Sequence, residues 1–184
     1  MVNEKNSIRK NIRQQCLTLS EQTIKKYSLA ICQQIVNLPC YKTATHIGVY
    51  LALKHEADLQ FFIDQAWRDH KIIYLPVITD YEKKIMEFYS YTASTTLELN
   101  RYGILEPLIS PEKQTHLLDI IITPLVAFDN RLNRLGQGLG YYDRYLSTAH
   151  AITVGVGYEI QRVHAVPVEA WDIPLDFVIT ENSV

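Results

Sequence analysis

One short segment of the chain combines glycine, basic and aromatic residues in a spacing that suits a phosphate group. Residues 134–146 read RLGQGLGYYDRYL, with glycine at three alternate positions. Glycine tolerates positive φ and lets the backbone approach a ligand, so alternate glycines can turn successive N–H groups toward one anion. Arg134 and Arg144 flank the glycines with guanidinium groups that suit phosphate oxygens. A helix that begins after the last glycine would add its N-terminal partial positive charge.

The residues that follow the glycines suit a nucleotide and its metal ion. Tyr141 and Tyr142 offer a flat stacking surface and hydroxyl groups. Asp143 can hold a hard cation such as magnesium, which prefers carboxylates together with phosphate oxygens. The spacing matches neither G-x-x-x-x-G-K-[ST] nor G-x-G-x-x-G, because Tyr141 follows Gly140 directly. An irregular turn that needs glycine is the alternative interpretation, and the neighbouring arginines, aromatics and acid favour the nucleotide.

A second basic feature lies near the N-terminus. Lys5, Arg9 and Arg13 are four residues apart and share one face of a predicted helix. Such a row is usually a solvated face. A bound polyanion would turn its repulsion into attraction, so both interpretations stay open.

Helices and buried strands alternate along the chain. Apolar residues recur every four positions in a first predicted helix at about 5–17, and Ser20 is the predicted cap of a second helix that Pro39 ends. A third helix follows Asp58, its predicted cap. Runs of branched residues typical of strands buried on both faces lie at 46–52, 71–78, 119–128, 152–158 and 176–180.

This alternation predicts one α/β domain over residues 1–184, with a mostly parallel central sheet covered by helices. The alternating segment 85–91 suits an antiparallel strand at an edge. Ligands of open α/β sheets bind outside the carboxyl ends of the strands. The segment 129–140 follows such a strand as a loop, so we expect the glycines at that edge of the sheet.

The composition of the chain argues against several classes of function. The chain has 184 residues, 47% of them hydrophobic, and a net charge of −2, which gives no positive field for nucleic acid. The N-terminus lacks the apolar core of a secretory signal and no apolar run is long enough to span a bilayer, so a soluble cytoplasmic protein is expected. Three cysteines without C-x-x-C spacing indicate neither a disulfide framework nor a zinc site. H-E-x-x-H and G-x-S-x-G are both absent.

Motifs along nearly the whole chain give it a resemblance to one family. They are K-x-x-x-R at Lys5 and Arg9, HEAD with Glu56, LPV at 75–77, MEF at 86–88, GILEP at 103–107, PLVAFD at 124–129, RLGQGLGYYDRYL at 134–146 and GYEIQRVHAVPVEAWDIPLDFVITE at 157–181. With these motifs the chain resembles the 5-formyltetrahydrofolate cyclo-ligases, also called 5,10-methenyltetrahydrofolate synthetases.

The resemblance implies a ligase of folate and one-carbon metabolism. Such an enzyme converts 5-formyltetrahydrofolate to 5,10-methenyltetrahydrofolate with ATP and magnesium and releases ADP and phosphate. Phosphorylation of the formyl oxygen would turn it into a leaving group before ring closure. The resemblance also implies a three-layer α/β fold of the kind found in some sugar-phosphate isomerases and CoA-transferases.

Carried over by motif, the resemblance implies the following sites. ATP would be bound by Lys5, Arg9, Arg134, Leu135, Gly136, Gln137, Gly138, Leu139, Gly140, Tyr141 and Tyr142. The folate would be bound by Leu51, Glu56, Tyr102, Gly138, Gly140 and Tyr142. Magnesium would be held by Asp143 and Asp176, and the catalytic residues would be Glu56, Arg134 and Tyr142.

Two positions depart from the family pattern. Relatives often have glycine where Leu132 stands, and lysine or glycine where Leu139 stands. If that lysine contacts phosphate in relatives, its absence leaves Lys5, Arg9, Arg134 and the backbone amides to bind ATP here.

Two other function classes stay open from the residues. A sugar-phosphate isomerase or acyl transferase on a similar sheet would bind a phosphorylated substrate without hydrolysing ATP. A non-catalytic nucleotide or folate binding module would bind without turnover. We expect small-molecule substrates, neither a nucleic-acid nor a membrane partner, and a monomer.

Overall fold

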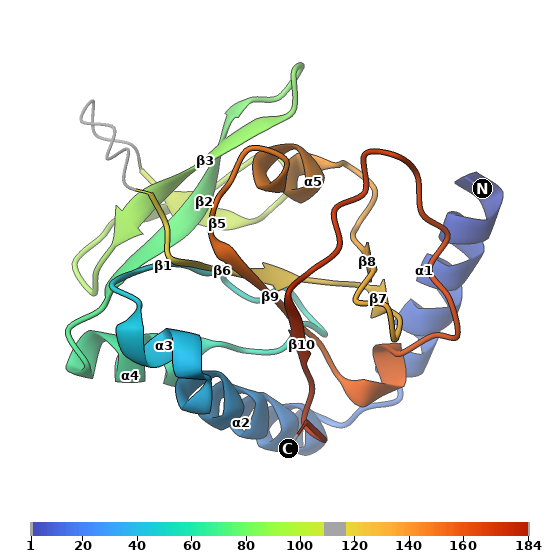
Figure 1. Cartoon of the computed structure of the whole chain (residues 1–184), viewed down its shortest axis with the longest axis horizontal. Coiled ribbons are helices and arrows are strands. Elements are labelled where there is room, and N and C mark those ends of the chain that lie inside the picture. Colours follow the sequence, from blue (N-terminus) through green and yellow to red (C-terminus); the bar gives the residue numbers. More distant parts are fainter. Residues whose placement is uncertain (1, 109–116, 184) are drawn as a thin grey trace.

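A central sheet of six strands runs through the computed structural model, which describes residues 2–108 and 117–183 (Figure 1). The strands in spatial order are β10 (Phe177–Ile179), β9 (Ile152–Val156), β6 (Ile120–Pro124), β1 (His46–Gly48), β2 (Ile72–Asp80) and β3 (Ile85–Tyr91). Neighbouring strands are parallel except β2 and β3, which are antiparallel at one edge. The predicted single α/β domain with a mostly parallel sheet is confirmed, as is the antiparallel edge strand.

Helices cover both faces of the sheet and give three layers (Figure 1). One face carries α2 (Glu21–Asn37), α3 (Pro39–Thr43) and α4 (Gln60–Arg68), and the other carries α5 (Tyr141–Leu146). Within β6, Ile120 and Ile122 are buried in the core cluster of α2 and α4, whereas Ile121 is buried in the α5 cluster. Each such side chain contributes about 1.5 to 3 kcal/mol by leaving water. The likeness to sugar-phosphate isomerases and CoA-transferases stays a prediction.

The N-terminal helices follow the sequence closely. The first helix, α1, spans Val2–Cys16, and Ser20 caps α2 by accepting a hydrogen bond from the Thr23 backbone N–H at 3.1 Å. Pro39 follows the end of α2 as predicted. It also begins α3, which is too short to show a helical period in the sequence. None of the helices in the described part of the chain is long and apolar enough to cross a membrane.

Three local predictions were wrong in detail. The predicted strand at 46–52 ends at Gly48, after which the chain leaves the sheet. The predicted strand at 119–128 divides into β6 and β7 (Ala127–Phe128), and β7 pairs with β8 (Arg134–Leu135) in a small hairpin. Asp58 lies one residue before the N-cap of α4, although its Oδ1 accepts a hydrogen bond from the Gln60 N–H.

Several short elements gave no recognisable sequence pattern. Strands β4 (Leu97–Leu99) and β5 (Leu105–Pro107) form a hairpin beside β2, and η1 (Glu159–Gln161) is one turn of 3₁₀ helix that contacts α1. Strands of three residues are too short for an alternation to stand out. The β4–β5 hairpin supplies part of the cavity wall described below.

The loop between β7 and β8 is built on one buried carboxylate. Asp129 accepts four hydrogen bonds, from the N–H groups of Arg131, Asn133 and Val166 and from the Asn133 side-chain amide. Leu132 in this loop has φ of 63°, in the left-handed region that glycine occupies without strain. Its side chain packs against the α5 core cluster, and this packing offsets the strain. The loop leads directly into Arg134 and the glycines.

Asp129→Asn is expected to lower the free energy of unfolding by about 1.5 to 3 kcal/mol, because one acceptor oxygen becomes an NH₂ group that faces two donors. Burial alone would raise the pKa of Asp129, but its hydrogen bonds outweigh burial and lower that pKa. Its stabilising contribution is therefore present above about pH 4 and is lost as the pH falls through the lowered pKa. Urea denaturation across this pH range measures the difference.

The matched control is Asp80→Asn, because both backbone hydrogen bonds of Asp80 go to a single oxygen that asparagine retains. A difference between wild type and Asp129→Asn that persists unchanged well below pH 4 would contradict the role of the charge.

Candidate functional site

A cavity of about 710 Å³ lies where β1, β2 and β6 end. Its wall comes from segments far apart in the sequence: the start of α1, residues 50–56 after β1, residues 76–86, residues 100–106, residues 124–126 after β6, residues 134–144, and residues 169–173. The glycines thus lie at the carboxyl edge of the sheet, as the sequence predicted.

The glycine loop, residues 134–140, needs glycine for two different reasons. Gly138 and Gly140 have φ of 103° and 76°, in the left-handed region, and Gly140 is the N-cap of α5. A Cβ at Gly136 would instead lie 2.9 Å from Nη1 of Arg134. The loop is therefore shaped both by backbone conformation and by the close approach of a guanidinium group.

The basic row on α1 faces the glycine loop and the segment 169–173. Arg9 Nε donates to the Gly136 carbonyl oxygen at 2.9 Å, and Arg13 Nη2 donates to Oε1 of Gln137 at 2.5 Å. Burial and the like charge of Arg13 lower the pKa of Arg9. The interpretation of this row as a purely solvated face is therefore wrong for Arg9.

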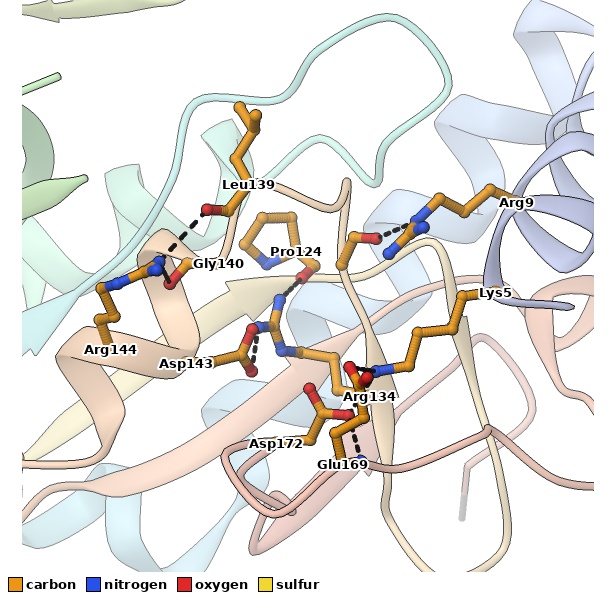
Figure 2. A network of polar contacts seen from close by, with 11 residues as sticks. Lys5, Arg9, Pro124, Arg134, Leu139, Gly140, Asp143, Arg144, Glu169 and Asp172 are labelled. Atoms are coloured by element: carbon orange, nitrogen blue, oxygen red, sulfur yellow. Dashed lines mark hydrogen bonds and ion pairs between the residues drawn. The ribbon is translucent and has the colours of Figure 1, made fainter. Parts of the chain in front are cut away.

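Lys5 is buried and forms two ion pairs with the C-terminal segment. Its Nζ lies 3.0 Å from Oε2 of Glu169 and 2.5 Å from Oδ2 of Asp172 (Figure 2). Burial opposes the charge of Lys5, but the two carboxylates outweigh burial and raise its pKa. Lys5 is thus a fully charged group in the cavity wall that joins α1 to residues near the C-terminus.

Arg134 is buried and incompletely satisfied. Its Nη2 forms an ion pair with Oδ1 of Asp143 at 2.9 Å, and its Nη1 donates to the Pro124 carbonyl at 3.3 Å (Figure 2). Its Nε is buried, and no residue in 2–108 or 117–183 accepts a hydrogen bond from it. A buried donor on a cation without an acceptor is costly, and an anion bound in the cavity would satisfy it.

Arg144, predicted to flank the phosphate, holds the glycine loop in this structure. Its Nη1 donates to the carbonyl oxygens of Leu139 and Gly140 (Figure 2). The side chain also lines the cavity, where it is exposed.

Glu56 and Tyr142 provide groups that can exchange protons with a ligand. Glu56 Oε2 accepts from the Leu53 N–H at 2.9 Å, and its Oε1 lies 3.5 Å from the Gln137 amide. Burial raises the pKa of Glu56. The hydroxyl of Tyr142 is buried and has no partner within the described part of the chain, and burial raises its pKa strongly, so it remains a neutral donor.

The structure brings most of the predicted site residues to this one cavity. Its wall contains Lys5, Arg9, Leu51, Glu56, Arg134, Leu135, Gly136, Gln137, Gly138, Leu139, Gly140, Tyr141, Tyr142 and Asp143.

Tyr102 and Asp176 lie outside the cavity wall. The Tyr102 ring makes an edge contact with Tyr141, and the two hydroxyl oxygens are 3.4 Å apart. Asp176 is exposed, and its Oδ2 accepts from the backbone N–H and the hydroxyl of Thr153, each at 2.8 Å. Thr153 is near the start of β9, about 10 Å along the strand from the carboxyl edge. The roles predicted for these two residues stay predictions.

Sequence reasoning missed several residues of the cavity wall. Glu169, Trp171 and Asp172 line it beside Lys5, and Asn100 and Glu106 line it from the β4–β5 hairpin. Glu169, Trp171 and Asp172 lie in the motif at 157–181 that was quoted for the resemblance. No rule of sequence spacing relates an acid at 172 to a lysine at 5. In the described part of the chain, no group of three or more His, Cys, Asp or Glu side chains forms a ready metal site.

Comparison with known proteins identifies the family. The model of the 5-formyltetrahydrofolate cyclo-ligase family matches residues 1–181. The chain belongs to this family. The 5-formyltetrahydrofolate cyclo-ligase of Haemophilus influenzae is 34% identical over 177 residues, which cover 94% of this chain and 95% of the relative. That of Escherichia coli strain K12 is 37% identical over 178 residues, which cover 94% and 98%.

Solved structures agree with this family membership. The 5,10-methenyltetrahydrofolate synthetase of Aquifex aeolicus superimposes with a TM-score of 0.85 at 31% identity, and the match covers 97% of this chain and 90% of that chain. A synthetase from Mycoplasma pneumoniae gives a TM-score of 0.77 at 25% identity, with 97% and 99% covered. The chain therefore shares the fold of these synthetases over nearly its full length.

Proposed function

We propose that this cyclo-ligase family member converts 5-formyltetrahydrofolate to 5,10-methenyltetrahydrofolate, using ATP and releasing ADP and phosphate. The observation that carries the proposal is the buried Arg134, which lines the cavity with Lys5, Arg9 and the glycine loop and whose Nε has no acceptor among the described residues. Three cations at one end of a cavity suit a triphosphate.

The triphosphate would lie on the glycine loop. Its oxygens would replace the protein oxygens that now accept hydrogen bonds from the basic side chains. Arg9 is bonded to a backbone carbonyl, and Lys5 and Arg134 are paired with carboxylates. Phosphate oxygens are stronger acceptors than a carbonyl for a guanidinium group. The adjacent N-terminus of α5 would add a small favourable contribution.

The cavity wall also fits magnesium. Magnesium usually takes one or two protein carboxylates together with substrate phosphates and water. The carboxylates of Asp143 and Asp172 line the same cavity, each already beside a cation at the phosphate end. We propose these two as the residues that would hold the metal, which would neutralise phosphate charge. This geometry favours Asp172 over Asp176 as the partner of Asp143.

The chemistry requires activation of a poor leaving group. A formamide oxygen cannot depart as oxide, so the γ-phosphoryl group would pass to the formyl oxygen as the bond to ADP breaks. The second folate nitrogen would then attack the formyl carbon, and the C–O bond would break to release phosphate. Such transfer depends on positioning and charge neutralisation rather than on a protein nucleophile.

Glu56 and Tyr142 would serve the ring closure. The attacking nitrogen must lose its proton, and Glu56, whose pKa is raised by burial, is a stronger base than an exposed carboxylate and a suitable acceptor. The Tyr142 hydroxyl stays protonated and can donate a hydrogen bond to an oxygen of the folate. Leu51 adds apolar wall beside Glu56.

The direct test combines the purified protein with 5-formyltetrahydrofolate, ATP and magnesium. We expect the ultraviolet absorption band of the methenyl product, with one ADP released per product molecule, and neither without ATP. Turnover of a phosphorylated substrate without ADP release would favour an isomerase or acyl transferase. Tight binding of both ligands without turnover would favour a binding module.

Arg9→Met is expected to weaken ATP binding about ten- to a hundredfold, because it removes one charge-assisted hydrogen bond of about 1.5 to 3 kcal/mol. The measurement is the KM for ATP at saturating folate and magnesium. Lys10→Met, an exposed position of the same helix, is the matched control and should leave that KM unchanged. An unaltered KM in Arg9→Met would remove α1 from the ATP site.

Asp172→Asn and Asp176→Asn separate the two candidate metal ligands. We expect Asp172→Asn to raise the magnesium concentration for half-maximal rate about ten- to a hundredfold, since one charged contact is lost. Asp176→Asn should leave the magnesium dependence near that of wild type. The reverse pattern would restore Asp176 to the metal site and refute Asp172.

A further inference from the structure

Glu106 is a buried acid in the cavity wall to which neither the proposed reaction nor the resemblance gives a role. It lies on β5, in the GILEP motif, and only 7% of its surface is exposed. Both of its hydrogen bonds go to Oε2, from the Ile78 N–H at 3.3 Å and from the Asn100 side-chain amide at 3.0 Å. Among residues 2–108 and 117–183, no group donates to its Oε1 and no cation pairs with it.

Asn100 fixes the orientation of this carboxylate. Its Oδ1 accepts from the backbone N–H groups of Tyr102 and Ile104 at 2.9 and 3.1 Å, so its NH₂ group must point to Glu106. The side chain of Glu106 is thereby held by one oxygen, and the other oxygen is left for a ligand. A buried carboxylate without a cation is costly, so a fixed one that lines a cavity indicates a complementary donor.

The ligand of Glu106 must donate hydrogen bonds, which excludes phosphate groups. An adenine edge places an acceptor nitrogen beside its amino group, and that acceptor would repel a carboxylate. The pyrimidine edge of a reduced pterin presents its 2-amino group and its N3–H side by side. The free Oε1 can accept from both of these neighbouring donors, because a carboxylate oxygen has two acceptor positions. The neighbouring wall residues Ile78, Met86 and Ile104 are apolar and suit the flat ring.

We propose that Glu106 binds the 2-amino-4-oxo-pyrimidine edge of the folate substrate. This assignment rests on the proposed function, because it takes the substrate to be a reduced folate. The pterin then occupies the end of the cavity between β2 and the β4–β5 hairpin, with ATP at the end formed by α1 and the glycine loop. The formyl group, on the far side of the pterin from its pyrimidine edge, faces the phosphates.

The test measures the affinity for 5-formyltetrahydrofolate without ATP in wild type and in Glu106→Gln. In the variant, the glutamine oxygen keeps the bonds from Ile78 and Asn100, and its NH₂ group faces the pterin donors. We expect the Kd to rise about ten- to a hundredfold while the Kd for ATP stays unchanged. Glu98→Gln is the matched control, because Glu98 is the exposed cross-strand neighbour of Glu106 outside the cavity wall.

A folate analogue with a methyl group in place of the 2-amino group locates the contact. Wild type should bind this analogue more weakly than the natural folate, and Glu106→Gln should lose little further affinity for it. Equal losses for both ligands in Glu106→Gln would overturn the assignment. The assignment would also be overturned if Glu56→Gln, rather than Glu106→Gln, bound the natural folate more weakly but lost little further affinity for the analogue.

These outcomes separate the inference from the proposed function. Normal methenyl formation by Glu106→Gln, with an unchanged Kd for the folate, would refute the role of Glu106 and leave the reaction standing. If Glu106→Gln does not fold, the wild-type protein alone decides, because equal affinity for the folate and its 2-methyl analogue would overturn the proposal.

Discussion

The ion pairs of Lys5 join the first helix to the segment just before the last strand, and the cavity depends on this connection. Without it, α1 would be held by its apolar contacts with β7 and η1 and by the hydrogen bonds of Arg9 and Arg13 to the glycine loop. Lys5, Glu169 and Asp172 are mostly buried, and a buried charge is tolerated only when it is paired. Because these buried charges must be paired, the ion pairs that fix α1 also place three charged groups at one end of the cavity.

The charges of this wall neutralise one another in the absence of ligands. Lys5 is paired with two carboxylates and Arg134 with Asp143. An anion alone must compete with those carboxylates, and a cation alone must compete with Lys5 and Arg134. A pair of ligands that carries both signs of charge can bind both members of each ion pair that it breaks. A wall of this kind favours a nucleotide that arrives with its metal ion over either one alone.

The sequence predicted the parts of the fold that local physics encodes, and it missed those that depend on distant partners. Branched runs marked the parallel strands, and glycine spacing located the loop at the carboxyl edge. The β4–β5 hairpin and the roles proposed for Asp172 and Glu106 carry no local signal, because each depends on residues that only folding brings near. Asp176 and Tyr102 were assigned from the resemblance; in the structure Asp176 is bonded to Thr153 and Tyr102 lies beside Tyr141, and both residues are outside the cavity wall.

The first helix begins at the cavity itself. Val2 is exposed and lines the wall, while the other end of the chain emerges beside α2, on the far side of the sheet (Figure 1). Any polypeptide fused ahead of Val2 would start at the cavity wall. Purification handles and fluorescent fusions therefore belong at the C-terminus, away from the cavity.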